Sequence, residues 1–204
     1  MALAESEAPL PDDVRTMLDD ADDRIERFHF DHRDAPLPGF VPCDFVAVRG
    51  AIGQIAERGL TPGQRFVEWG SGLGVATCLA SLAEFDAVGI EIEPDLVAAA
   101  EAFADDHGVE VEFALGSYVP EGGDELLDDH AADLDREVTW LKTYGASAYE
   151  SLGLDPDDFD LVFAYPWPGE EGVIFDLFAE YAAVGALLLT YHGEDGVLLQ
   201  RKVR

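Results

Sequence analysis

Residues 68–74 read EWGSGLG, with three glycines at alternate positions directly behind a short apolar run. Glycine has no Cβ, so it adopts positive φ at little cost and lets a ligand approach the main chain closely. A helix that begins after such a loop adds free N–H groups, which can donate to a carboxylate or a phosphate. The stretch therefore predicts a ligand-binding turn between a strand and a helix.

Around this turn the chain alternates between strand-like apolar runs and segments with helical spacing. Strict alternation favours parallel strands joined by right-handed crossovers. The sequence therefore predicts an α/β fold, a doubly wound and mostly parallel sheet with helices on both faces. The expected strands are 66–69, 87–92, 109–114, 159–164, 186–191 and 197–203. The expected helices are 12–28, 44–58, 72–83, 94–107 and 171–183, and the acidic segment 124–152 is expected to be mostly helical.

Acidic residues dominate the composition, with 43 Asp plus Glu against 12 Lys plus Arg and a formal net charge of −31 in 204 residues. Because 48% of the residues are hydrophobic, the chain is expected to fold despite this charge. The negative field opposes binding to nucleic acid or to anionic membranes, and favours a small molecule or a basic protein as partner. Adaptation to a saline cytoplasm is an alternative reason for the acidity.

Few residues point to a metal, a disulfide framework or a membrane. Cys43 and Cys78 have no metal-ligand spacing and suit a reducing compartment, so a cytoplasmic location is expected. No signal peptide or apolar run of membrane-spanning length is recognised. We also expect no metal site, because the His and Asp residues at 29–34 lie in a proline-broken connector rather than on one helix face.

Two acidic residues near the glycines narrow the choice of ligand. Glu68 would repel a pyrophosphate but attract an ammonium or a sulfonium group. The glycine spacing also departs from the dinucleotide pattern, since Val75 stands where a third small residue is expected. Glu91 ends the next strand, where a carboxylate can accept both hydroxyls of a ribose. The alternative is a tight turn without a ligand, followed by a solvated surface acid.

On these residues the chain resembles the class I S-adenosylmethionine-dependent methyltransferases. The stretch FVEWGSGLG is similar to the family's first motif and GIEIEP to its second. The resemblance implies a Rossmann-like fold and S-adenosylmethionine as cofactor. It also implies that Glu91 holds the ribose and that Ile92 lies against the adenine. The methionine portion would be cradled by Glu68, Gly70, Ser71, Gly72 and Gly74.

The later motifs match this family less well. In ALGSYVP, Ser117 stands where an acidic residue commonly binds the adenine amino group, and it is equally suited to bond the turn that follows. In FAYPWP, two of four positions match the Asn or Asp, Pro, Pro, aromatic tetrapeptide of enzymes that methylate amino nitrogens. Tyr165 and Trp167 are expected to line the catalytic channel, where their rings can make cation–π contacts with an alkylammonium group. The alternative is that both rings only cover the sheet edge.

Upstream, the segment GFVPCDF is similar to the entry segment of the small protein lysine methyltransferases of the mitochondrial and prokaryotic type. That resemblance implies that Phe40, Val41 and Pro42 lie over the cofactor. We therefore expect an N-terminal helical extension and linker over residues 1–38 and a methyltransferase domain over 39–204.

The expected function is methyl transfer to a nitrogen nucleophile, with a protein lysine as one candidate acceptor. Three alternatives stay open: a small-molecule methyltransferase, a non-catalytic scaffold with this fold, and a nucleotide-dependent oxidoreductase. Stabilisation by S-adenosylhomocysteine separates the first two, and a comparison with NADH addresses the third.

Overall fold

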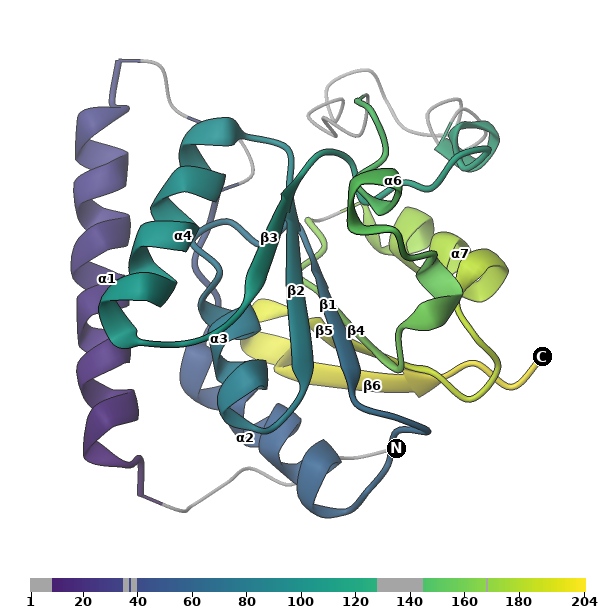
Figure 1. The fold of residues 1–204 in the computed structure, drawn as a ribbon, viewed down its shortest axis with the longest axis horizontal. Helices are drawn as coiled ribbons and strands as arrows, with labels where there is room; N and C mark the ends of the chain where they lie inside the picture. The colour runs from purple at the N-terminus through teal and green to yellow at the C-terminus, as the bar shows by residue number, and fades with distance from the viewer. Residues whose placement is uncertain (1–8, 35–36, 38–39, 128–144, 168) are drawn as a thin grey trace.

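Six strands form a mixed sheet at the centre of the protein (Figure 1). The computed structural model describes residues 9–34, 37, 40–127, 145–167 and 169–204. The strand order is β3-β2-β1-β4-β5-β6, in which β6 is antiparallel to β5 and every other neighbouring pair is parallel. The strands are β1 (Arg65–Trp69), β2 (Asp86–Glu91), β3 (Glu112–Leu115), β4 (Leu161–Ala164), β5 (Leu187–Tyr191) and β6 (Val197–Arg201). The predicted doubly wound, mostly parallel sheet is confirmed.

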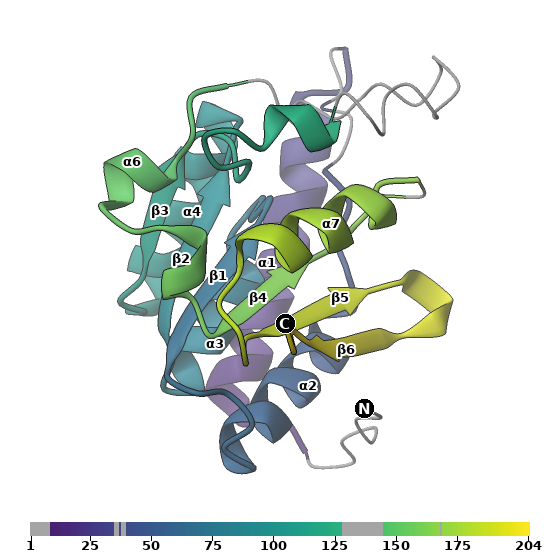
Figure 2. The same ribbon diagram turned by 90° about the vertical axis from the view of Figure 1, so that its right-hand side faces the viewer.

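Helices cover both faces of this sheet (Figures 1 and 2). One face packs against α2 (Phe45–Glu57), α3 (Val75–Leu82) and α4 (Pro94–His107). The other face packs against α7 (Glu171–Tyr181) and the short α6 (Tyr149–Leu152). Each face has its own apolar core, so the sheet is buried on both sides as a parallel sheet requires.

Neighbouring side chains of β1 enter different cores. Phe66 belongs to the core beneath α2 and α3, whereas Val67 and Trp69 belong to the core beneath α7. Glu68 lies on the α3 side, where it bonds to Thr77. Because successive residues of a strand point to opposite faces, Glu68 and Trp69 deliver a carboxyl group and an indole ring to the two sides of one strand end.

The N-terminal helix α1 (Asp12–Asp31) lies across α3 and α4 rather than on the sheet (Figure 1). Its buried apolar face, which includes Met17 and Ala21, joins a core with Leu79 and Phe103. A domain boundary between residues 38 and 39 falls on residues outside the described ranges and stays a prediction. In the parts of the chain that the structure describes, no helix combines the length and apolar character needed to cross a membrane.

Some expected boundaries are wrong. The helix expected from residue 72 begins at Val75, because Gly72 and Gly74 have φ of +53° and +74°, which a right-handed helix does not admit. The segment 124–152 is helical at 124–127 and again in α6, but residues 145–148 are not helical and Ser147 forms a parallel bridge with Ser117. The rest of that expected helix lies outside the described residues.

Candidate functional site

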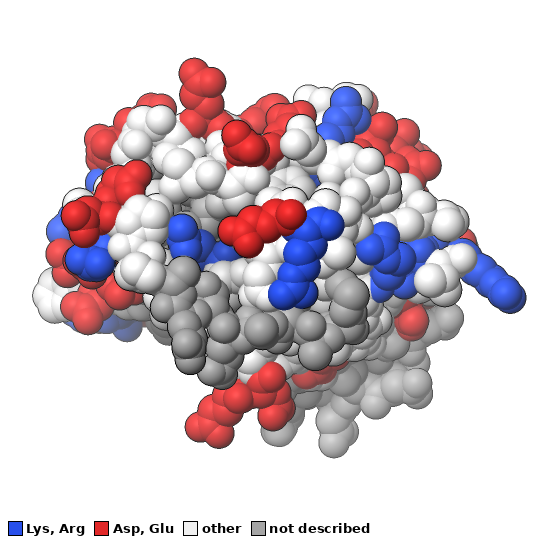
Figure 3. Space-filling view, turned by 90° about the horizontal axis from the view of Figure 1, so that it is seen from below, with Lys and Arg blue, Asp and Glu red and all other residues white. Residues whose placement is uncertain are grey.

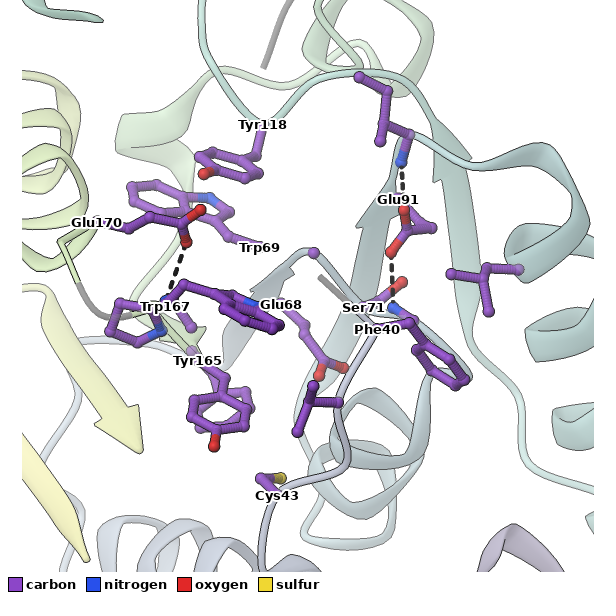
Figure 4. Close-up of a pocket in the computed structure, with 18 of the residues that line it drawn as sticks. Phe40, Cys43, Glu68, Trp69, Ser71, Glu91, Tyr118, Tyr165, Trp167 and Glu170 are labelled. Carbon is purple, nitrogen blue, oxygen red and sulfur yellow. Dashed lines mark hydrogen bonds between the residues drawn. The ribbon is translucent and has the colours of Figure 1, made fainter. Parts of the chain in front are cut away.

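A cavity of about 170 Å³ lies at the carboxyl ends of β1, β2 and β4 (Figure 4). The order of the strands reverses between β1 and β4, and open α/β sheets bind ligands at such a switch point. The glycine loop after β1 and the residues around Phe40 and Tyr165 contribute to its wall. The predicted ligand-binding turn therefore borders a pocket.

Main-chain hydrogen bonds fix the glycine loop against β2. The N–H groups of Gly70 and Ser71 both donate to the carbonyl oxygen of Ile90, each at 2.9 Å. Gly70 has a φ of +75°, and a Cβ at this position would meet nothing within 4 Å, so its Cα borders open space. A Cβ on Gly72 would lie 3.0 Å from a ring carbon of Phe40. The Phe40 ring therefore covers the middle of the loop.

Glu68 is buried on the α3 side of β1, with 6% of its surface exposed. Its Oε2 accepts the N–H of Thr77 at 2.8 Å and the hydroxyl of Thr77 at 2.6 Å. Burial raises the pKa of Glu68 to about 8; the bonds from Thr77 lower it, and the charge of Glu91 raises it. From the sequence, Glu68 was expected to be an ionised carboxylate. Because burial raises its pKa to about 8, it is largely protonated near neutral pH. A cationic group placed beside it would favour the ionised form.

Glu91 joins the end of β2 to the glycine loop. Its Oε2 accepts the N–H of Gly72 at 2.8 Å, and its Oε1 accepts the N–H groups of Ile92 at 2.8 Å and Glu93 at 3.0 Å. Burial raises the pKa of Glu91, the three N–H bonds lower it, and the charge of Glu93 raises it. Since each carboxylate oxygen can accept two bonds, Oε2 keeps the capacity to accept a ligand hydroxyl.

Ser71 has the one hydroxyl in the glycine loop, and it is 5% exposed. Within the described residues its Oγ has no hydrogen-bond partner. Buried polar groups without a partner are uncommon, because each costs about 1 to 3 kcal/mol of desolvation. The Ser71 hydroxyl is thus placed to bond a polar group of a ligand.

The opposite side of the pocket is built from aromatic rings and one acid. Trp69 and Tyr118 stack with ring centroids 5.4 Å apart and planes 9° from parallel. The Trp69 indole N–H donates to the hydroxyl of Tyr149 at 2.9 Å. Glu170 accepts the N–H of Trp167 at 3.0 Å. We call Trp69, Tyr118, Trp167 and Glu170 the aromatic half, and the 70–74 loop with Glu68 and Glu91 the glycine half.

Most of the site residues predicted from sequence line this pocket. They are Glu68, Gly70, Ser71, Gly72, Glu91, Ile92, Tyr165 and Trp167, together with Phe40 and Val41 of the entry segment. Gly74, Ser117 and Pro42 do not line it. Gly74 instead precedes α3 as its cap residue, and the Ser117 hydroxyl accepts the N–H of Val119 at 3.1 Å. The bond to Val119 matches the alternative reading of Ser117, a serine that bonds the turn after it.

Sequence reasoning missed Trp69, Tyr118, Glu170 and Cys43, which also line the pocket. Trp69 stood inside the quoted motif, and strand alternation could have placed it across β1 from Glu68. Glu170 follows the YPWP stretch, near the expected start of a helix, and could have been suspected from that position. Nothing in the local sequence joins Tyr118 to Trp69, because Tyr118 follows β3 and reaches the end of β1 only through the packing of the sheet.

Comparison with known proteins gives one short sequence match. No model of a known protein family matches the chain. Over 75 residues it is 36% identical to the ribosomal protein L11 methyltransferase of Cupriavidus taiwanensis. This stretch spans 36% of the chain and only 25% of the relative's length.

Solved structures extend the comparison to most of the chain. An RNA methyltransferase from Salinibacter ruber, solved with S-adenosyl-L-homocysteine, has a TM-score of 0.50 and 22% identity over 74% of this chain and 76% of its own. A Klebsiella pneumoniae protein assigned as an O-methyltransferase has a TM-score of 0.51 and 16% identity, covering 90% of this chain and 66% of its own. The chain has the class I S-adenosylmethionine-dependent methyltransferase fold. The methyltransferase fold was expected from the EWGSGLG and GIEIEP motifs, and it is confirmed.

Proposed function

We propose that the protein binds S-adenosylmethionine and transfers its methyl group to a nitrogen nucleophile. The observation that carries the proposal is a glycine loop flanked by two buried carboxyl groups at the ends of adjacent strands. Glu91 bonds the N–H of Gly72 in the loop, and Glu68 bonds Thr77 in the helix that follows it. The loop lies at the switch point of a methyltransferase fold. Such a site suits a ligand that carries cations, a carboxylate and a ribose.

The residues present fit this ligand. The Ser71 hydroxyl has no bond within the described residues, and the space beside Gly70 is open. Glu68 lines the pocket, where an ammonium or sulfonium beside it would favour its ionised form. The cavity of about 170 Å³ is smaller than the roughly 300 to 1,000 Å³ of most ligand pockets. We propose that the Phe40 ring, which covers Gly72, moves to admit the ligand.

S-adenosylmethionine supplies a methyl carbon on a good leaving group, so the protein needs mainly to align the acceptor and exclude water. Glu91 holds the loop in place through the N–H of Gly72. Phe40 and Val41 shield the loop side of the pocket. Tyr165 and Trp167 line the end of β4, where the acceptor would enter.

The acceptor is proposed to be a nitrogen, with a lysine of a basic protein as one candidate and a small amine as the other. The sequence match to a ribosomal protein L11 methyltransferase supports a protein acceptor. A phosphate-bearing acceptor is disfavoured, because the described lining contains Glu68, Glu91, Glu93 and Glu170 but no Lys, Arg or His. The free thiols of Cys43 and Cys78 suit a reducing compartment, and we propose the cytoplasm.

Calorimetric titration with S-adenosylhomocysteine tests the cofactor. The parent should bind, and ligand at 100 times Kd should stabilise the fold by about 2.7 kcal/mol. Gly72→Val should abolish binding, because a β-branched side chain at a φ of +53° would strain the loop and add bulk to the pocket wall. Ser71→Ala should weaken binding about tenfold with little effect on folding.

The control is Gly193→Ala, at a positive φ of +60° with nothing within 4 Å and outside the pocket lining. It should bind like the parent. Absence of binding by the parent would leave a non-catalytic scaffold, and tighter binding of NADH would favour an oxidoreductase. Transfer of a labelled methyl group to lysine peptides or small amines then identifies the acceptor.

A further inference from the structure

We propose that the aromatic half of the pocket binds an alkylamine as its ammonium ion. The acceptor of the proposed methyl transfer would be the neutral amine, formed when the bound ammonium gives one proton to the carboxylate of Glu170. The claim that the bound amine receives the methyl group rests on the proposed function. The binding of a cation by Trp69, Tyr118, Trp167 and Glu170 can be tested without it.

Trp69, the most buried ring of the aromatic half, is held in place by a contact outside the cavity. Trp69 is 4% exposed, and its indole N–H is bonded to Tyr149, which belongs to α6. Tyr118 lies parallel to Trp69 and also lines the pocket. Figure 4 shows Trp69, Tyr118, Trp167 and Glu170 on the same side of the pocket, away from Glu91 and Phe40. A fixed group of electron-rich rings is the arrangement that recognises alkylammonium ions.

Glu170 gives this side of the pocket its negative charge. It is half-buried at the start of α7, and it forms no ion pair within the described part of the chain. Burial raises the pKa of Glu170, the Trp167 N–H lowers it, and the charge of Glu171 raises it. An entering cation would offset the cost of keeping this carboxylate ionised.

The charges of the whole molecule favour the same guest. The described pocket lining includes four Glu residues and no basic residue. Figure 3 shows several Lys and Arg side chains, interspersed with Asp and Glu, on the face at the amino ends of the strands. Arg201 and Lys202 of that end donate to backbone carbonyls rather than to the pocket. The field at the pocket therefore attracts a cation and repels an anion.

Choline and its neutral isostere 3,3-dimethylbutan-1-ol provide the test. The two have the same shape and differ in one charge, so their affinities for the parent, measured by calorimetry at one salt concentration, isolate the cation. Choline should bind at least tenfold more tightly. Equal affinities would overturn the proposal, because shape and apolar contact would then explain all binding.

Two neighbouring acids supply a matched pair of variants. Glu170 and Glu171 each accept one backbone N–H, from Trp167 at 3.0 Å and from Gly169 at 2.7 Å, but of the two only Glu170 lines the pocket. Glu170→Gln should weaken choline binding five- to tenfold, while Glu171→Gln should change it less than twofold. If the two variants weaken choline binding equally, the loss of one negative charge explains both effects. The assignment of Glu170 as the carboxylate beside the bound cation would then be overturned.

The rings are tested with Tyr118→Leu, which should weaken choline binding at least fivefold. Trp69→Leu is less suitable as a test, because Trp69 is buried and its replacement would also lower the stability of the fold. Circular dichroism and a thermal unfolding midpoint close to that of the parent confirm that Tyr118→Leu is folded. Unchanged choline binding by folded Tyr118→Leu would contradict the aromatic half as the site.

The two ligands separate this inference from the proposed function. If the protein binds S-adenosylhomocysteine but not choline, the ammonium site is contradicted and the proposed methyltransferase function is not. If it binds choline but not S-adenosylhomocysteine, the proposed methyltransferase function is contradicted and the ammonium site is not. Competition of choline by n-butylamine or by a lysine peptide then distinguishes a small amine from a protein side chain as the source of the ammonium.

Discussion

The two halves of the pocket are held together in different ways. In the glycine half, Glu91 bonds three N–H groups of nearby residues, and Glu68 bonds the N–H and hydroxyl of Thr77. In the aromatic half, ring stacking and a Trp69 to Tyr149 bond join residues 49 to 80 positions apart. One half is a local main-chain structure, and the other is an assembly of distant side chains.

This difference indicates how each half responds to change. The glycine half has little freedom, because its main chain is bonded to β2 and its carboxyl groups are buried. The aromatic half depends on side-chain contacts that a substitution can remove singly. A side chain added at a positive-φ glycine of the loop should therefore affect the whole fold, while loss of one side-chain hydrogen bond to the aromatic half should have a smaller and more local effect.

The largest effect is expected from Gly74→Ala. Gly74 has a φ of +74°, and a Cβ there would overlap the ring of Phe113. The left-handed backbone costs about 1 kcal/mol and the overlap about 2 more, so urea denaturation should show a loss of about 3 kcal/mol. Gly108→Ala is the control, since Gly108 has a φ of +64° but nothing within 4 Å, and it should lose about 1 kcal/mol. Equal losses would show that Phe113 does not constrain the loop.

A pH dependence of intermediate size is expected from Glu68. Its folded pKa of about 8 lies above the ordinary value of 4.5, so between these values the folded protein binds more protons than the unfolded chain. Stability from this group is therefore present at low pH and lost as pH rises, by about 2 kcal/mol between pH 6 and pH 8. Glu68→Gln keeps an oxygen acceptor for Thr77 and should remove that slope.

Chemical denaturation of both proteins at several pH values and constant high salt measures the difference. Subtracting the two curves removes the contribution of the other acidic residues. If stability varies with pH in parallel for the parent and Glu68→Gln, the pKa of Glu68 is not raised by folding. The glycine half would then not contain a buried carboxyl group that stays protonated near neutral pH.

The smallest effect is expected from Tyr149→Phe, which alters a partner of the aromatic half outside the pocket. The change removes the acceptor of the Trp69 N–H and should cost about 1 kcal/mol, with a change in tryptophan fluorescence. Tyr181→Phe is the control, because no hydrogen bond of the Tyr181 hydroxyl occurs within the described residues. It should stay within about 0.5 kcal/mol of the parent. A loss as large as that of Gly74→Ala would break the contrast between the two halves.

The glycine half was largely predictable from sequence. The motif around Gly70 and Gly72 needs positive φ within a few residues, and Glu91 ends the next strand, so local order and strand alternation were sufficient to place them together. The helix after the loop was predicted three residues too early, because apolar spacing does not register the positive φ of Gly72 and Gly74. Ser117 was harder, since its hydroxyl accepts the N–H of Val119 and the residue does not line the pocket.

By itself the sequence determined the sheet, its mostly parallel order and the acid-flanked loop at its switch point. These depend on hydrophobic periodicity and glycine geometry, which act over a few residues. Only the tertiary structure decided that Trp69, Tyr118 and Glu170 share one side of the pocket, and that Glu68 is buried deeply enough to raise its pKa. Burial and contact between distant side chains depend on how whole elements pack, and no short stretch of sequence contains that information.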